Sequence, residues 1–275
     1  MEELGRNASY ALGHSEGEME RLSTQARVFE PFTRRMLQQA GLSQGMRVLD
    51  VGCGTGDVTF LCASLVGTTG EVIGMDRAPA AVDKATERAR AGQAGNVTFM
   101  VGGPGESRFE QKFDAVVGRL VLMHQPDPVA MLRELSGLIR IGGIIAFQEF
   151  DITATRSFPP SPTFEQCVQW ISTAFTMSGT DIQMGLKLYS TYVAAGLAPP
   201  SMSLDAGIWG GENNPGAIMV SDAVRTLLPV FQKLGIAPGI EAEIDSLRSR
   251  IQQEISAGGG VTISPTLIGA WTQAG

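Results

Sequence analysis

Three glycines in alternate positions, Gly52, Gly54 and Gly56, join an apolar run to a helical pattern within Val48–Asp57. Glycine has no Cβ and tolerates a positive φ, so such a turn lets the backbone approach a ligand closely. The free N–H groups at the start of the following helix attract negative charge. The G-x-G-x-G spacing differs from the G-x-G-x-x-G of dinucleotide-binding turns, whose third glycine packs below a pyrophosphate. The segment is therefore typical of a loop that binds a smaller anionic group, or of a tight strand-to-helix turn.

A carboxylate ends the next apolar run, Glu71–Asp76. In doubly wound folds, an acid at the end of the second strand lies beside the first loop and accepts hydrogen bonds from ribose hydroxyls. Asp76 and the glycine turn together therefore predict a nucleoside ligand.

The elements that must position these residues follow an alternating pattern between Gly45 and Phe150. Short β-branched runs alternate with helical stretches, which is typical of a parallel sheet whose strands are buried on both faces. We expect strands at Arg47–Val51, Glu71–Asp76, Val97–Val101, Phe113–Gly118 and Ile144–Glu149. We expect helices at Val58–Val66, Pro79–Ala91 and Pro128–Arg140.

Outside this region the pattern is mainly helical. A helix is expected from Ser15, with an interruption at Pro31 because proline removes a backbone donor. Further expected elements are a helical stretch at Thr163–Leu197 broken near Ser178-Gly179, two helices within Gly216–Ala257, and strands at Ser201–Ile208 and Val261–Trp271.

Composition restricts the class of protein. The chain has 275 residues, of which 43% are hydrophobic, and a formal net charge of −7, which argues against a nucleic-acid partner. No apolar stretch is long enough to cross a membrane, so we expect a cytoplasmic protein without a membrane partner. Three cysteines, an odd number, favour reduced thiols. Two histidines are too few for a His-rich metal centre, and we expect no metal.

Class I S-adenosylmethionine-dependent methyltransferases are the family that the chain resembles. The resemblance rests on four segments in the family's order and spacing, namely Asp50–Asp57, Asp76, Phe113–Arg119 and Leu138–Gly143. Looser similarity at both ends, at Tyr10–Gly13 and Leu267–Trp271, indicates the bacterial small-molecule type that is similar to ubiquinone and menaquinone methyltransferases.

The resemblance implies an α/β, Rossmann-like fold. Its sheet would have seven strands in the order 3-2-1-4-5-7-6, with the seventh antiparallel and helices on both faces. Residues 1–44 would form an N-terminal helical lid, and residues 45–275 a methyltransferase domain with a helical insertion at about 214–258.

The resemblance also implies S-adenosylmethionine as cofactor and places its contacts. Asp50 and the backbone of Gly52, Cys53 and Gly54 would hold the methionine portion, and Asp76 would bind the ribose. The other implied contacts are Met75 or Arg77 beside the adenine, the backbone of Gly118 and Arg119 at the sulfonium end, and Tyr10 from the lid.

One loop departs from the family's pattern. After the third strand the family often has an acid, which meets the adenine amino group, but this chain has Gly103 followed by Pro104. Either backbone groups of this loop recognise the adenine, or Glu106 takes the role, or recognition of the cofactor is weaker or altered.

Two polar residues near the carboxyl ends of the strands are candidates for catalysis. His124 follows the fourth strand, and an unperturbed pKa of roughly 6.5 suits a general base; its alternative role is to cap the next helix or bond the cofactor loop. Glu149 ends the fifth strand, where it would act in catalysis or orient the substrate, or serve as a cap or solvated loop acid.

Three further residues are candidates for the acceptor's pocket. His14 belongs to the expected lid, or to an ordinary surface segment. Phe175 and Trp209 would line an apolar pocket, or belong to the core.

The function expected from these features is methyl transfer to an O, N or C atom of a largely apolar small molecule, such as a secondary metabolite or quinone-like compound. Two alternatives stay open: the same fold and cofactor used for a cyclisation or rearrangement, and a non-catalytic protein that binds the cofactor or an apolar ligand. The expected partner is the small-molecule acceptor, and a homodimer is left open.

Overall fold

The structure, a computed structural model, describes residues 16–106 and 109–275, with side chains from residue 28 onward. The chain divides into two compact units. The sheet unit comprises Phe29–Glu149, Met184–Leu204 and Leu267–Gly275, and the helical unit comprises Met1–Val28, Phe150–Gln183 and Asp205–Thr266. The division into a lid before residue 45 and a domain after it stays a prediction.

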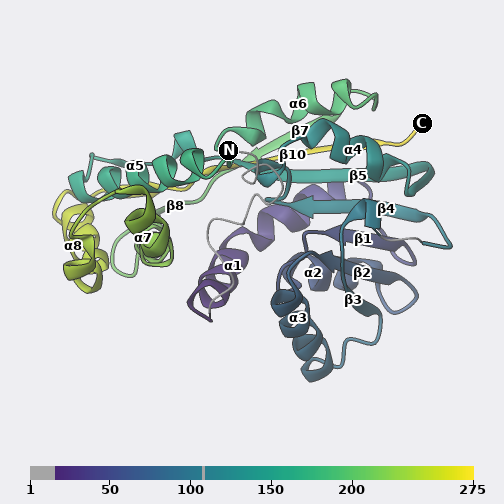
Figure 1. Ribbon diagram of the computed structural model, residues 1–275, viewed down its shortest axis with the longest axis horizontal. Helices are drawn as coiled ribbons and strands as arrows, with labels where there is room; N and C mark the ends of the chain where they lie inside the picture. The colour runs from purple at the N-terminus through teal and green to yellow at the C-terminus, as the bar shows by residue number, and fades with distance from the viewer. Residues whose placement is uncertain (1–15, 107–108) are drawn as a thin grey trace. The chain divides into compact units, whose positions relative to one another are not determined.

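A seven-stranded sheet in the order β3-β2-β1-β4-β5-β10-β7 organises the sheet unit (Figure 1). Its strands are β1 (Arg47–Val51), β2 (Glu71–Asp76), β3 (Val97–Val101), β4 (Phe113–Arg119), β5 (Ile139–Asp151), β7 (Ser201–Asp205) and β10 (Thr266–Gln273). Strands β3, β2, β1, β4 and β5 pair in parallel. The end of β10 pairs with the start of β5, where the N–H of Gly142 donates to the carbonyl oxygen of Ala274, so β10 is antiparallel. The predicted order, with its single antiparallel strand, is confirmed.

Helices cover both faces of this sheet. The part of α1 (Glu16–Gln39) from Phe29 onward lies on one face with α2 (Asp57–Val66) and α3 (Pro79–Ala91), and α4 (Pro128–Ser136) and α6 (Met184–Ala194) lie on the other (Figure 1). The hydroxyl of the fully buried Tyr192 on α6 donates to the carbonyl oxygen of Ala270 on β10, which anchors this helix.

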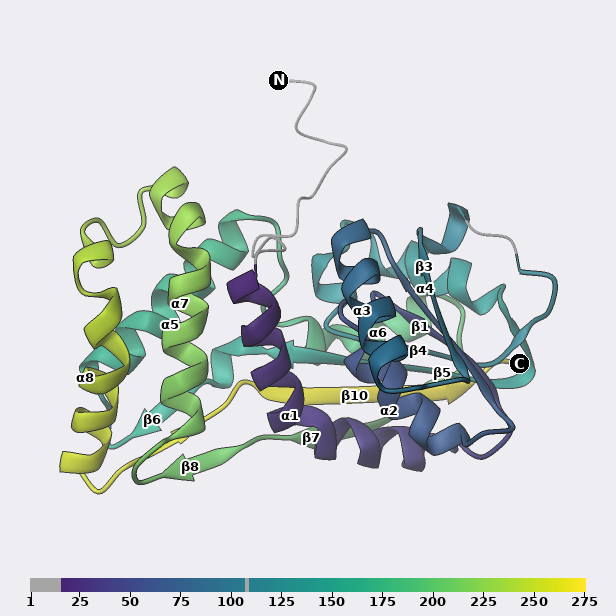
Figure 2. The same ribbon diagram turned by 90° about the horizontal axis from the view of Figure 1, so that it is seen from below.

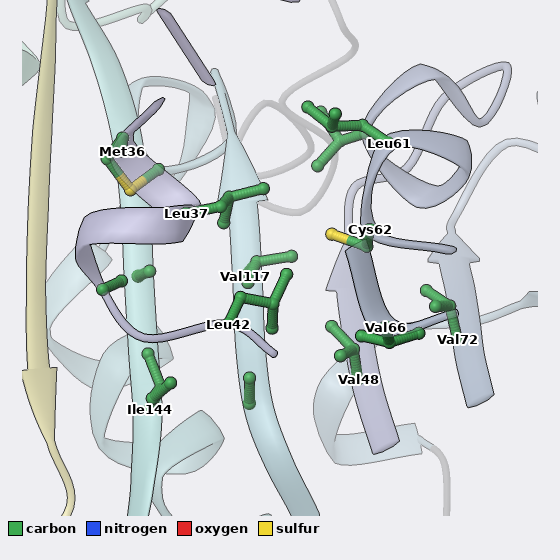
Figure 3. Close-up of a cluster of buried hydrophobic side chains, with 14 residues drawn as sticks. Met36, Leu37, Leu42, Val48, Leu61, Cys62, Val66, Val72, Val117 and Ile144 are labelled. Carbon is green, nitrogen blue, oxygen red and sulfur yellow. The ribbon is translucent and has the colours of Figure 1, made fainter. Parts of the chain in front are cut away.

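An apolar core lies between the sheet and the two helices α1 and α2 (Figure 3). Met36 and Leu37 from α1 and Cys62 and Val66 from α2 are almost completely buried. The strand residues of the same cluster are Val48, Val72, Ala115, Val117, Ile144 and Ala146. Burial of each large apolar side chain contributes about 1.5–3 kcal/mol, so this cluster gives α1 and α2 a fixed position on the strands.

Two predicted boundaries were wrong. Pro31 does not interrupt the first helix, since α1 continues to Gln39. The burial of Met36 and Leu37 on the sheet outweighs the one backbone hydrogen bond that a proline removes. The helix expected to reach Arg140 ends at Ser136, because Ile139 already pairs with Phe113 as part of β5.

The helical unit consists of three long helices and a small sheet. Helices α5 (Pro162–Met177), α7 (Pro215–Leu234) and α8 (Ile244–Ala257) pack on one another (Figure 2). Strand β9 (Val261–Ile263) pairs antiparallel with β6 (Arg156–Phe158) and β8 (Ile208–Gly210). The Glu254 carboxylate of α8 accepts the Ser161 hydroxyl at 2.6 Å and so ties α8 to the start of α5. The two helices expected in the second half of the chain are confirmed. The strand expected at Ser201–Ile208 is split between β7 and β8, and the strand expected at Val261–Trp271 is split between β9 and β10.

The described residues contain neither a membrane-spanning helix nor a candidate metal site. In the ranges 16–106 and 109–275, no helix is long and apolar enough to cross a membrane. The same ranges contain no group of three or more His, Cys, Asp and Glu residues placed to hold a metal ion.

Candidate functional site

The glycine loop between β1 and α2 adopts a conformation that requires glycine. Gly52, Gly54 and Gly56 have φ values of +65°, +53° and +91°. A Cβ on Gly52 would lie 2.7 Å from Val121, and one on Gly56 would lie 2.8 Å from the ring of Phe99, so the chain packs tightly at both positions. A Cβ on Gly54 would have no atom of the described residues within 4 Å. The loop therefore exposes its backbone to open space at Gly54, at the carboxyl edge of the sheet.

The carboxylate of Asp76 joins the end of β2 to this loop. Its Oδ2 atom accepts the N–H of Gly54 at 2.8 Å, and its Oδ1 atom accepts the N–H of Ala78 at 2.9 Å. Each carboxylate oxygen has a second lone pair, so Asp76 can still accept hydroxyl donors from a ligand. The two residues that the sequence assigned to one nucleoside site are in direct contact.

Arg88 of α3 holds the same loop in place, a role for which the sequence contains no signal. Its guanidinium donates to the carbonyl oxygen of Thr55 at 2.5 Å and to the carboxylate of Asp57 at 2.9 Å. It also lies over the ring of Phe60, 5.1 Å from the centroid. Through these contacts, Arg88 connects the loop at Thr55 to the start of α2 at Asp57.

Asp50 lies in the interior at the end of β1 and is 1% exposed. Its Oδ2 atom accepts the hydroxyl of Thr59 at 2.6 Å, whereas its Oδ1 atom is buried and has no hydrogen-bond partner among the described residues. Burial raises the pKa of Asp50 from 3.8 to about 7, although Thr59 and Arg119 act in the opposite direction. The site thus holds a buried acceptor that lacks a cationic or N–H donor.

Arg119, at the end of β4, starts a chain of hydrogen bonds across the same face. It donates to the hydroxyl of Thr33 at 3.1 Å, and Thr33 in turn donates to the Gln148 Oε1 atom at 2.8 Å. Gln148 is fully buried, and its Nε2 atom has no hydrogen-bond partner in the part of the chain that the structure describes. Burial lowers the pKa of Arg119, but Asp50 and Glu30 are among the carboxylates that favour its charged form. Thr33 and Gln148 could not be identified from the sequence, because neither is in a recognisable motif.

Glu149 supports the loop that follows β4, on the sheet's other face. It is fully buried, and its carboxylate accepts the backbone N–H groups of Val121 at 2.9 Å, Leu122 at 2.8 Å and Met123 at 3.2 Å. Leu120, just before them, has a φ of +57°. Both carboxylate oxygens are therefore engaged with the backbone. This geometry favours the cap among the expected roles of Glu149, and its catalytic and substrate-binding roles stay predictions.

His124 ends the short helix η2 (Leu122–His124) that Glu149 supports. Burial lowers the pKa of this imidazole from 6.5 to about 4, so it is neutral at pH 7. A neutral imidazole can accept a proton, but one with this pKa is a weaker base than an exposed histidine.

The loop after β3 is the one that lacks the family's usual acid at Gly103. Glu106, at the end of the short helix η1 (Pro104–Glu106), accepts the N–H of Gly103 at 3.0 Å through its Oε2 atom. The Arg77 guanidinium covers the same glycine, since a Cβ there would lie 3.0 Å from Nε. The loop thus carries an acid at Glu106, beside the position where the family often has one.

Three other expected contact residues are well packed. Met75 is fully buried, and its carbonyl oxygen accepts the N–H of Cys53 at 3.1 Å, so Arg77 is the exposed member of the Met75 and Arg77 pair. Burial raises the pKa of the Cys53 thiol far above its usual value, which fits a spacer residue. A Cβ on Gly118 would lie 2.4 Å from the ring of Phe147.

A match to a protein-family model identifies the family of this chain. The model for the methyltransferase domain matches residues 42–193, more than half of the chain. The chain belongs to the methyltransferase domain family. S-Adenosylmethionine is the cofactor that this domain implies.

Two known methyltransferases resemble this chain over about half of its length. Demethylmenaquinone methyltransferase of Staphylococcus aureus is 33% identical over 134 residues, which cover 48% of this chain and 52% of the relative. Aklanonic acid methyltransferase DauC of a Streptomyces species is 32% identical over 143 residues, 52% of this chain and 64% of the relative. The match therefore spans only about half to two thirds of each relative's length.

A solved structure supports the fold of this methyltransferase. YcgJ from Bacillus subtilis matches with a TM-score of 0.55 and covers 88% of this chain and 98% of its own. At 16% identity, this likeness concerns the fold alone.

The amino-acid end of S-adenosylmethionine fits the polar groups of this methyltransferase. The unpartnered Asp50 Oδ1 is an acceptor for an ammonium group, the open face of Gly54 leaves room for the ligand, and the Asp76 carboxylate suits ribose hydroxyls. The residues of the sheet unit therefore match the groups that the cofactor carries.

The remaining expected residues lie outside the sheet unit or outside the described part of the chain. Tyr10 and His14 are outside the described residues. Phe175 is a buried residue of α5, and Trp209 in β8 packs its ring against Gly207; both belong to the helical unit. Their roles in substrate binding stay predictions.

Proposed function

We propose that this methyltransferase transfers the methyl group of S-adenosylmethionine to an O, N or C atom of a small, largely apolar molecule. The observation that carries the proposal is the set of groups along one edge of the sheet. An open glycine backbone at Gly54, a carboxylate at Asp76 and an unsatisfied buried carboxylate oxygen at Asp50 match a nucleoside joined to an amino acid.

In this proposal the chain's own residues act mainly by alignment. Asp76 binds the ribose hydroxyls, Asp50 binds the ammonium group, and Arg77 and Glu106 border the adenine. The bound cofactor supplies a methyl group already activated by its sulfonium. His124 is the candidate that takes a proton from the acceptor, because its imidazole is neutral at working pH.

The class of acceptor is supported by composition and by the relatives. Two relatives are named for demethylmenaquinone and aklanonic acid, which are both small molecules. A net charge of −7 and a hydrophobic content of 43% favour such an acceptor over a nucleic acid.

The test uses S-adenosylmethionine labelled in its methyl group, with a panel of hydroquinones and polyketide phenols. We expect label in at least one acceptor, together with an equal amount of S-adenosylhomocysteine. Asp76→Asn should abolish most of this turnover by weakening cofactor binding, whereas Asp83→Asn, at an exposed position of α3, should leave it unchanged.

Two results would overturn the proposal. Conversion of an acceptor while all label stays on the cofactor would indicate a cyclisation or rearrangement. Binding of the cofactor without turnover of any acceptor would indicate a non-catalytic binding protein.

A further inference from the structure

A layer of five polar side chains lies between the apolar core and the carboxyl edge of the sheet unit. We call it the polar layer, and its members are Thr33, Asp50, Thr59, Arg119 and Gln148. Thr33, Asp50, Thr59 and Gln148 are each at most 1% exposed. Two of its atoms, Asp50 Oδ1 and Gln148 Nε2, are buried and have no hydrogen-bond partner within residues 28–106 and 109–275.

Strand register places the members of this layer on one face. Asp50 pairs with Val117 and Val117 with Ala146, while Arg119 pairs with Gln148 two residues further along the same strands. Residues two apart on a strand point to the same side, and so do directly paired residues of neighbouring strands. Asp50, Arg119 and Gln148 therefore leave adjacent strands on the same face, the one covered by α1 and α2.

The two unpartnered atoms are of opposite kinds. Asp50 Oδ1 is an acceptor, and Gln148 Nε2 is a donor whose orientation is set by the hydrogen bond from Thr33 to the Gln148 Oε1 atom. Native proteins satisfy almost all buried polar atoms, so an unpartnered pair at a ligand site indicates groups that a ligand completes. A ligand that satisfies both atoms carries an ammonium group and a carboxylate, as the end of an amino acid does.

Arg119 supplies the matching positive charge. Its guanidinium has five N–H donors, and within the described residues its hydrogen bond goes to Thr33, which engages one of them. Since Thr33 also donates to Gln148, one hydroxyl holds the guanidinium and the amide in a fixed relation. A carboxylate beside them would receive charge-assisted hydrogen bonds, the strong class of such contacts.

We propose that Arg119 and Gln148 together bind the α-carboxylate of the cofactor's amino-acid end, while Asp50 binds its α-ammonium group and Thr33 positions the pair. This inference rests on the proposed function, because it assigns the ligand as S-adenosylmethionine or its demethylated product.

The test compares three ligands by calorimetry at pH 8. S-Adenosylhomocysteine has both charged groups, its decarboxylated analogue keeps only the amine, and 5′-methylthioadenosine has neither. The variants are Gln148→Met and Arg119→Met, which keep bulk without the amide or the charge. Gln38→Met, at an exposed position of α1, is the matched control.

We expect the wild type to bind S-adenosylhomocysteine about 10- to 100-fold tighter than the decarboxylated analogue. Gln148→Met and Arg119→Met should each remove much of this preference, because each should lower the affinity only for S-adenosylhomocysteine, which carries the carboxylate. Their affinity for the decarboxylated analogue and for 5′-methylthioadenosine should stay within about twofold of the wild type, and Gln38→Met should behave as the wild type.

Equal weakening of all three ligands would overturn the inference, because it would mean that the two residues only maintain the loop. Unchanged affinities in both variants would also overturn it, and would indicate that the two unpartnered atoms bind ordered water instead. A wild type that binds S-adenosylhomocysteine without preferring it to the decarboxylated analogue would overturn this inference alone. A wild type that binds none of the three ligands would overturn the proposed function.

Discussion

The buried carboxylate of Glu149 accepts the backbone N–H of Leu122 at 2.8 Å. The end of β5 thereby holds the short helix that follows β4 and ends at His124. Backbone N–H groups at the start of a helix commonly bind an anion from a ligand, but here a side chain of the protein fills that role. The carboxylate thus fixes the geometry of a loop at the sheet's carboxyl edge.

Replacement of Glu149 by Gln should destabilise the protein by about 2–4 kcal/mol, because the amide NH₂ would face backbone N–H groups that need an acceptor. Urea unfolding followed by circular dichroism measures the effect. The same substitution at Glu87, an exposed residue of α3, should change the free energy of unfolding by less than about 0.5 kcal/mol. Equal stability of Glu149→Gln and the wild type would contradict the role of Glu149 as a support for the loop.

Asp50 should make the stability of the protein depend on pH. Its pKa is raised from 3.8 to about 7 in the folded chain, so between these values the native state holds a proton that the unfolded state releases. The free energy of unfolding should therefore fall as pH rises from about 4 to about 7 and then level off, with a loss of about 4 kcal/mol at most.

Asp50→Asn removes this titration, and the variant should be more stable than the wild type at pH 8 while binding S-adenosylhomocysteine more weakly. Urea unfolding at a series of pH values gives both stability curves, and calorimetry gives the affinity. Parallel curves for the variant and the wild type would show that Asp50 does not carry the pH dependence.

His124 should stay neutral across the physiological range. Because burial lowers its pKa to about 4, the resonances of its ring should not titrate between pH 5.5 and 8 in an NMR experiment. The chain has two histidines, so comparison with His124→Asn assigns the signals. A midpoint near 6.5 for His124 would mean that water reaches the imidazole, and any inflection of the rate at that pH could then belong to this residue.

The strands of the sheet unit were predictable because a parallel strand buried on both faces has to be an apolar run. Arg47–Val51, Glu71–Asp76 and Val97–Val101 have the predicted bounds. The break predicted at Pro31 was wrong because the local preference for a break is weaker than the burial of Met36 and Leu37 on the sheet.

Only the part of the candidate site that belongs to a recognisable sequence motif could be predicted. Gly54 and Asp76 belong to such a motif, and they are in contact. Arg88 and Gln148 reach the loop and the polar layer from α3 and β5, and a single sequence contains no signal for contacts of that kind. The pKa of His124 could not be predicted either, since it depends on how deeply the folded chain buries the ring.

Alanine substitutions at Gly54 and Gly196 can separate the effect of backbone strain on stability from the effect on ligand binding. Gly54 and Gly196 both have a positive φ, +53° and +84°, and in the described part of the chain no atom lies within 4 Å of a Cβ built at either position. Alanine at either position should therefore fold, with a loss of about 1 kcal/mol for the left-handed backbone.

Only Gly54→Ala should also lower the affinity for S-adenosylhomocysteine, by about 10-fold or more, because the open space beside Gly54 is where the ligand approaches the backbone. Calorimetry on both variants, with urea unfolding to verify equal stability, separates the two effects. If both variants bind the ligand as the wild type does, the cofactor does not approach the loop at Gly54, and the open space there has another cause.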